Sequence, residues 1–294
     1  MLSKIFITWY VYPPDPFYWI WIEDVKGIVV TFSSISKRLI DKFSVRGLKS
    51  FLGFNGVILV DSLTAPLKNY YIEKSHFPQY FLLNLQRSLG ADILIHKDYP
   101  LISKNLTNKD KTKLLLKTIR NAEVAIKIAE KLGAEIMLVI QGWNIESYLY
   151  TAKKYRELGI KYAGIGSLIY RRNNKNELVK IVKSIRDELN SYVHIHLFGV
   201  MSPGILSEIL KYVNSFDVST PMKAAIAREA IVIRENRIKR IKLDHLSIND
   251  LIFDNKSAKL AEKIFSATNA RELKNRLAIY NTYVLFKWFK SIGE

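Results

Sequence analysis

The 294-residue sequence contains no cysteine, which excludes disulfides, cysteine-ligated zinc, iron–sulfur clusters and thiol nucleophiles. It also lacks a long apolar run. The apolar stretch 5–12 stops at Pro13 and Pro14, and it is too short and too aromatic for a signal peptide or a membrane helix. No glycine-rich nucleotide loop follows any strand candidate, so a Rossmann domain or a P-loop is unsupported. We therefore expect a cytoplasmic protein without a metal, a cofactor or a membrane partner.

Acidic residues are few relative to basic ones: 27 Asp and Glu stand against 45 Lys and Arg, for a formal net charge of +18. Such an excess favours a polyanionic partner such as a nucleic acid. The alternative is a lysine-rich surface without a defined patch, because composition does not locate charge. Glycine and proline are also few, while 49% of the residues are hydrophobic, which indicates a globular chain with a large core.

What the sequence does contain is a regular alternation of two patterns. Short apolar runs rich in β-branched and aromatic residues alternate with segments whose apolar positions return every three or four residues. Eight such runs predict an α/β fold, a (β/α)8 TIM barrel, with an open doubly wound sheet as the alternative. The predicted strands are residues 4–12, 27–32, 56–62, 92–98, 135–142, 162–168, 193–200 and 215–220.

After residue 222 the pattern changes. Residues 230–243 predict a basic β-hairpin with its turn at Glu235–Asn236, and residues 256–291 are mainly helical in pattern. We predict a single barrel domain over residues 1–294, with a core of about 1–222 and a C-terminal hairpin and helices over 223–294. Within the core, helices are predicted at 107–133, 144–159, 174–190 and 202–214, with Thr107, Asn144 and Ser202 as candidate N-caps.

Polar residues recur at the carboxyl ends of the predicted strands, where barrel enzymes carry their chemistry. Asp61, Asp98 and Asp217 supply three carboxylates, and Gln141 supplies an amide. A single aspartate at a strand end is ordinarily a helix cap or a loop hydrogen-bonder. Three such acids together with an amide predict a site instead, and the small residues that accompany them are Gly142, Gly166, Ser167 and Gly199.

This combination suits displacement at the anomeric carbon of a sugar. One carboxylate attacks and forms a covalent glycosyl intermediate, while the second moves protons. A third acid and an amide offer acceptors and donors to the edge of a heterocycle. Small neighbouring residues let a flat ring approach the backbone.

The order and spacing of these motifs resemble the queuine/archaeosine tRNA-guanine transglycosylases. The best segment is 194–225, where "HLFG" is followed by a helix and then by "FD" before a strand end. The resemblance covers roughly residues 56–290. Its other segments are 60–66 (VDSLTAP), 90–101 (GADILIHKDYPL), 139–168 (beginning VIQGW) and 276–290 (RLAIYNTYVLFKWFK).

The resemblance implies a pentosyltransferase that replaces guanine in tRNA with a 7-deazaguanine through a covalent aspartyl–sugar intermediate. Asp217 matches the nucleophile, and Asp61 matches the second acid, which transfers protons to and from the bases. Asp98, Gln141 and Gly166 match residues that hold the purine-like ring. The remaining residues expected at the base are Gly142, Ser167 and Gly199.

Several departures accompany the resemblance. The family usually carries a structural zinc held by three Cys and one His, and this sequence has no cysteine. "QGW" replaces "QGG" and "GSL" replaces "GGL", so Trp143 and Ser167 are expected to reshape the base pocket. We expect no C-terminal RNA-binding domain of the archaeal kind, which keeps DNA open as an alternative acceptor.

Other features have two interpretations. Basic residues of the C-terminal part are candidates for phosphate contacts, or they form a solvated strand pair. His194 and His196 share a strand face and are expected to pack or hydrogen-bond rather than bind metal. The candidates for phosphate contacts are Lys223, Arg228, Arg234, Arg237, Lys239 and Arg240.

The alternative function is that of a non-catalytic nucleic-acid-binding subunit of a transglycosylase complex. A third interpretation is an unrelated enzyme that acts on phosphorylated sugars. A homodimer or a complex with a partner stays open.

Overall fold

The computed structural model describes residues 4–11, 14–61, 78–101, 105–171, 174–199 and 203–293. The chain divides into two compact units. The first unit comprises Met1–Tyr12 and Lys26–Asp217, and the second comprises Pro13–Val25 and Val218–Glu294. The prediction of one domain with a core of about 1–222 stays a prediction.

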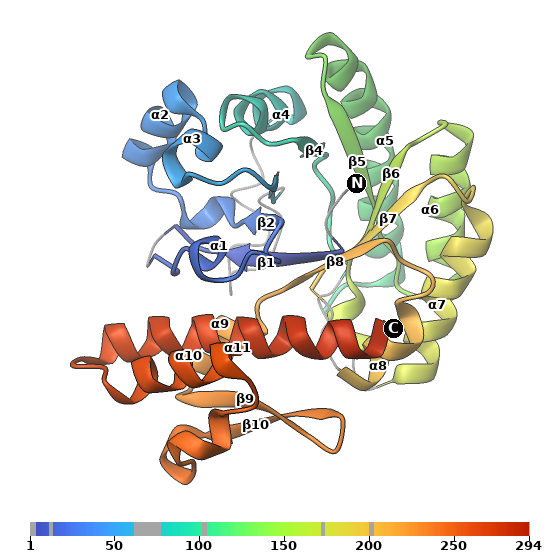
Figure 1. The fold of residues 1–294 in the computed structure, drawn as a ribbon. Helices are drawn as coiled ribbons and strands as arrows, with labels where there is room; N and C mark the ends of the chain where they lie inside the picture. The colour runs from blue at the N-terminus through green and yellow to red at the C-terminus, as the bar shows by residue number, and fades with distance from the viewer. Residues whose placement is uncertain are drawn as a thin grey trace. The chain divides into compact units, whose positions relative to one another are not determined.

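The first unit confirms the predicted (β/α)8 barrel. Eight strands form a closed sheet in chain order, neighbouring strands run parallel, and helices surround the sheet (Figure 1). The N–H of Phe216 donates to the carbonyl of Lys4 at 3.0 Å, which joins the last strand to the first. The strands are β1 (Ile5–Trp9), β2 (Gly27–Val30), β3 (Val57–Val60), β4 (Ile93–Ile95), β5 (Glu135–Ile140), β6 (Tyr162–Ile165), β7 (His194–Leu197) and β8 (Ser215–Val218).

Two long helices of this unit begin where a side chain satisfies one of the first backbone N–H groups. Thr107 and Asn144 each accept from the N–H three residues on, as the sequence predicts. The predicted cap Ser202 lies outside the described residues. The helical elements are η1 (Phe32–Ser34), α2 (Lys37–Arg46), α3 (Leu48–Leu52), α4 (Gln79–Ser88), α5 (Asn108–Lys131), α6 (Ile145–Glu157), η2 (Leu168–Arg171), α7 (Lys175–Glu188) and α8 (Pro203–Ile209).

An apolar cluster packs the first five strands on the inside of the barrel. Strand residues alternate between the two faces of a sheet, so one residue in two points inward. Each large apolar side chain buried in this way contributes about 1.5–3 kcal/mol to folding. The cluster therefore joins the first five strands, and it consists of Phe6, Val29, Leu59, Ile93, Ile95, Met137 and Val139.

The second unit contains the predicted hairpin and C-terminal helices. Glu235 and Asn236 both have positive φ, 54° and 56°, as a two-residue type I′ turn requires. Asn281 is fully buried: its Oδ1 accepts from the N–H of Ile231 at 2.7 Å, and its Nδ2 donates to the carbonyl of Glu229 at 3.0 Å. This amide therefore ties the hairpin to the last helix. The elements are α1 (Tyr18–Trp21), α9 (Thr220–Ile226), β9 (Glu229–Arg234), β10 (Arg237–Lys242), η3 (Leu243–His245), η4 (Ile248–Leu251), α10 (Asn255–Phe265) and α11 (Ala270–Gly293).

Several predicted elements are longer than the observed ones: the strand predicted at 4–12 ends at Trp9, and the helix predicted at 202–214 ends at Ile209. The strand predicted at 215–220 ends at Val218, and α9 begins at Thr220. Pro221 lies in the first turn of this helix, where its missing N–H has no helical partner to lose. The apolar pattern of the sequence did not reveal that the chain changes from strand to helix at this point.

Candidate functional site

Asp217 lies near the carboxyl end of β8 and is only 8% exposed. Both of its oxygens accept hydrogen bonds: Oδ1 from the N–H of Gly199 at 2.9 Å, and Oδ2 from the hydroxyl of Thr8 at 2.8 Å. Gly199 has φ of +66°, a conformation that glycine adopts without the steric cost of a Cβ. The predicted nucleophile and Gly199 are therefore brought together directly.

The surroundings of Asp217 favour its charged form. Burial raises the pKa of the carboxyl, but the His196 side chain, the Gly199 N–H and the Thr8 hydroxyl act in the opposite direction. The pKa of Asp217 lies below its ordinary value. The carboxyl group is therefore ionised at neutral pH, which is the state that a nucleophile needs.

Asp61 follows β3 directly and is partly exposed. Its Oδ1 accepts from the N–H of Phe32, and its own N–H donates to the carbonyl of Val30, both at 3.1 Å. Because all eight strands are parallel, the end of β3 and the end of β8 belong to the same rim of the barrel. The rest of the predicted motif, residues 62–66, lies outside the described residues, as do residues 200–202 of the segment 194–225.

A second buried group joins the ends of β4, β5 and β6. The amide nitrogen of Gln141 donates to Asp98 Oδ2 at 2.5 Å, and the hydroxyl of Ser167 donates to the amide oxygen of Gln141. Ser167 Oγ also accepts from the N–H of Leu101 at 2.9 Å. Three predicted base-binding residues are thus one hydrogen-bonded chain, and the amide of Gln141 is held in a single orientation.

Two glycines make room for this chain. A Cβ on Gly166 would lie 2.5 Å from the amide nitrogen of Gln141, so no larger residue fits without moving that amide. A Cβ on Gly142 would lie 2.6 Å from the ring of Tyr148. The hydroxyl of Tyr148 in turn donates to the carbonyl of Gly166 at 2.8 Å. Both glycines therefore serve close packing around Gln141.

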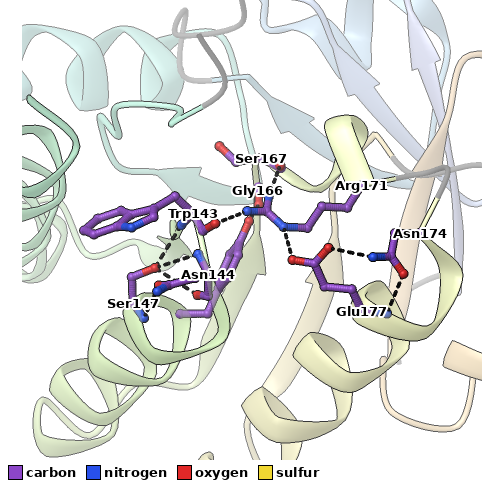
Figure 2. Close-up of polar contacts among 9 residues, drawn as sticks. Trp143, Asn144, Ser147, Gly166, Ser167, Arg171, Asn174 and Glu177 are labelled. Atoms are coloured by element: carbon purple, nitrogen blue, oxygen red, sulfur yellow. Dashed lines mark hydrogen bonds and ion pairs between the residues drawn. The ribbon is translucent and has the colours of Figure 1, made fainter. Parts of the chain in front are cut away.

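Arg171 connects the loops that follow β5 and β6 (Figure 2). Its guanidinium donates to the carbonyl of Trp143 and, at 3.4 Å, to the carbonyl of Ser167. It also pairs with Glu177 on α7 at 3.2 Å and lies over the ring of Tyr148. This one side chain therefore fixes two loops beside the Gln141 amide. That Trp143 reshapes a base pocket stays a prediction.

The predicted phosphate-contacting residues all belong to the second unit, and most carry a carboxylate partner. Arg228 pairs with Asp244, Arg234 with Asp250, Lys239 with Glu235 and Arg240 with Glu229. The first three pairs are exposed and contribute little to stability, so a phosphate can replace their carboxylates, whereas Glu229 is mostly covered. Lys223 and Arg237 have no ion pair within the described ranges.

The residues present do not fit the zinc that the resemblance implies. Three of its four ligands would be cysteines, and the sequence has none. Among the residues with described positions, no three His, Asp or Glu side chains gather closely enough to hold a metal ion. Within the described residues, none of the helices has both the length and the apolar character of a membrane span.

Sequence reasoning missed two residues at the site. Thr8 lies on β1, two residues after the inward-facing Phe6. Because side chains two residues apart share a strand face, the sequence could have predicted that Thr8 points into the barrel. Arg171 lies in a short 3₁₀ helix without any periodic pattern, and only the folded chain brings it to Trp143 and Ser167.

Comparison with known proteins agrees with this geometry. The sequence model of the family described as "Queuine tRNA-ribosyltransferase" (TGT) matches residues 29–293. A tRNA-guanine(15) transglycosylase of Korarchaeum cryptofilum (strain OPF8) is 26% identical over 162 residues, which are 54% of this chain and 27% of that protein. The chain thus spans about a quarter of the length of this relative. Since the family match extends over most of the sequence, the chain belongs to the queuine tRNA-ribosyltransferase (TGT) family.

Proposed function

We propose that this protein is a pentosyltransferase that exchanges a guanine base in tRNA for a free 7-deazaguanine base. The observation that carries the proposal is the ionised, buried Asp217, held by Gly199 and Thr8 at the rim of the barrel. A second acid, Asp61, lies on the same rim. Membership of the TGT family supports the same chemistry.

The reaction has two displacements at the ribose C1′ carbon. A carboxylate oxygen of Asp217 forms a bond to C1′, and the bond from C1′ to the guanine nitrogen breaks, with its electron pair leaving on the base. Asp61 gives a proton to the departing guanine and then takes one from the incoming base. The incoming nitrogen attacks C1′, the ester breaks, and the Asp217 carboxylate is restored.

The chain of Asp98, Gln141 and Ser167 supplies the base pocket in this proposal. A carboxylate accepts hydrogen bonds and an amide both donates and accepts, which suits the amino and carbonyl groups of a guanine-like edge. The target nucleotide must leave its stack to reach such a pocket. Basic residues of the second unit, Lys223 and Arg237 among them, supply phosphate contacts.

The test is incorporation of labelled guanine into unmodified tRNA, with single- and double-stranded DNA in parallel reactions. We expect label in tRNA, its release by unlabelled 7-deazaguanine, and a denaturation-resistant protein–RNA adduct that Asp217→Asn abolishes. Label found in DNA alone would show that DNA is the acceptor and that the exchange reaction is the same. A lack of incorporation into every acceptor, or incorporation that persists in Asp217→Asn, would disprove the proposal and favour a non-catalytic binding role.

A further inference from the structure

A line of polar side chains inside the barrel leads to Asp217, and the exchange reaction as proposed does not use it. His194 and His196 lie on one face of β7, and Ser215 lies beside His196 on β8. Ser215 Oγ is 2.8 Å from His194 Nε2 and 2.8 Å from His196 Nδ1. His196 and Ser215 are 0% and 1% exposed, so water does not compete for the contact between them.

The far end of this line faces the carboxylate. His196 Nε2 is 3.7 Å from Asp217 Oδ1, and within the described part of the chain it has no hydrogen-bond partner. The rings of Phe6 and Phe198 pack edge-on against the imidazole and hold it in place. A buried, unsatisfied nitrogen directed at a buried carboxylate is costly unless the two groups interact.

We assign the protons along the line from its contacts, starting at the carboxylate. A carboxylate only accepts, so the His196 nitrogen that faces it, Nε2, carries the proton. In this assignment Nδ1 accepts the hydroxyl proton of Ser215, whose oxygen accepts from His194 Nε2–H. Burial, together with the neighbouring His196 and Arg186, lowers the pKa of His194 to about 4, so that ring is neutral at neutral pH.

We propose that His196 is a positioning residue for Asp217, with its tautomer set by Ser215 and His194. Its Nε2–H keeps the carboxylate ionised and aimed at the sugar while substrate is bound. The distance of 3.7 Å exceeds that of a hydrogen bond, but such contacts are often long in the free enzyme and shorten in the complex. This inference rests on the proposed function, in which Asp217 is the nucleophile.

The titratable groups around the line are few. Asp217 on β8 and His194 on β7 face His196 directly. Next to His194 are the ring of Tyr162 on β6, with centroids 5.9 Å apart, and Arg186 on α7. Arg186 donates to the carbonyls of Val193 and Tyr212 and adds positive charge near His194 rather than near the carboxylate.

A matched pair of variants tests the role of Nε2. The amide of glutamine reaches about as far as Nε2, whereas the amide of asparagine reaches only as far as Nδ1. We expect His196→Gln to retain kcat within about threefold, because it keeps a donor toward Asp217. His196→Asn should lower kcat about 10- to 100-fold with little change in the KM for tRNA, and should move the acidic limb of the kcat/KM profile to higher pH.

Ser215→Ala provides a second variant that changes no group facing Asp217. It removes the hydroxyl that sets the tautomer, so we expect a loss of kcat intermediate between those of the two His196 variants. Circular dichroism and thermal unfolding identify any variant that fails to fold. Equal activity of His196→Asn and His196→Gln, with an unchanged acidic limb in both, would overturn the inference.

A readout without catalysis separates this inference from the proposed function. The carboxyl ¹³C resonance of Asp217, assigned by its loss in Asp217→Asn, reports the pKa of that group directly. We expect His196→Asn to raise this pKa by about one, and His196→Gln to leave it near its original value. An unchanged pKa in His196→Asn would refute the inference even if base exchange is intact. Failure of the wild-type protein to exchange bases would refute only the proposed function.

Discussion

Asp217 and Asp98 are both buried carboxylates at the ends of barrel strands, yet their surroundings differ. Asp217 accepts from a backbone N–H and a hydroxyl, and an imidazole nitrogen faces it. Asp98 accepts from the amide of Gln141, which is itself held by Ser167. Donors fixed to the backbone and to a buried ring stabilise a charge, whereas an amide chain presents a shaped hydrogen-bonding edge. The first arrangement suits attack on a sugar and the second suits recognition of a base.

Each carboxylate also has a buried histidine nearby, and the two histidines point to different partners. His196 directs Nε2 at Asp217. His96 instead accepts from the N–H of Val139 through Nδ1 at 3.1 Å, and its Nε2 contacts the hydroxyl of Tyr155 at 3.4 Å. The comparison therefore predicts that one histidine affects chemistry while the other affects stability.

The largest expected effect is the loss of the charge on Asp217. Asparagine has nearly the same shape but no charge, so Asp217→Asn should reduce base exchange by about 10⁴-fold or more, as removal of a covalent nucleophile does. Incorporation of labelled guanine into tRNA measures the loss. If Asp98→Asn lost as much, the assignment of different roles to the two carboxylates would be wrong.

The next effect concerns the pH dependence of folding through His96. Burial lowers the pKa of His96 to about 4, while Asp98 and two backbone contacts partly oppose that change. In the unfolded chain the pKa of His96 is near 6.5, so as the pH falls the unfolded state binds the proton before the folded state does. The contribution of neutral His96 to stability is therefore fully present above pH 6.5 and is lost as the pH drops toward 4. The expected loss is about 3 kcal/mol in the free energy of unfolding.

Denaturant unfolding at pH 7 and at pH 4.5 checks this linkage. His96→Asn keeps an acceptor near the N–H of Val139 but does not titrate, so its stability should depend less on pH. His196→Asn is the matched control, since it should shift the acidic limb of the kcat/KM profile but leave the pH dependence of unfolding as in the wild type. A pH dependence of unfolding that is the same in wild type and His96→Asn would contradict the prediction.

A smaller effect is expected from Asp98→Asn. The variant removes one charged acceptor from the chain that holds Gln141, which should raise the KM for the free base about 10- to 100-fold. The kcat at saturating base should change much less, because the group that attacks the sugar is intact. Steady-state kinetics with varied base concentration separate the two, and a fall in kcat alone would argue against a binding role.

The smallest expected effect is that of Gly166→Ala. Its Cβ would lie 2.5 Å from the amide nitrogen of Gln141 and would force that amide to move. We expect about a tenfold rise in the KM for the base, equivalent to about 1.4 kcal/mol. In a double-mutant cycle the same change added to Gln141→Ala should cost little more, because the clash is then gone. Additive losses would show that Gly166 acts independently of Gln141.

Much of the fold followed from local pattern. The apolar runs and the amphipathic segments between them predicted the eight strands and the barrel, because burial on both faces of a parallel sheet leaves a continuous apolar signature. The caps at Thr107 and Asn144 and the turn at Glu235–Asn236 were equally local, since each depends on a few adjacent residues. The end of β8 was misplaced because Thr220 and Pro221 suit a strand end and a helix start alike.

The sequence by itself determined which residue types stand at the strand ends, acids and an amide, and that no cysteine is available for a zinc site. Only the tertiary structure decided which hydrogen bonds those residues make and in which direction their pKa values shift. Thr8 reaches Asp217 across 209 positions of the chain, and Ser167 reaches Leu101 across 66. The physical reason is that periodicity reports burial along one element, whereas hydrogen bonds and pKa values depend on which elements the closed barrel brings together.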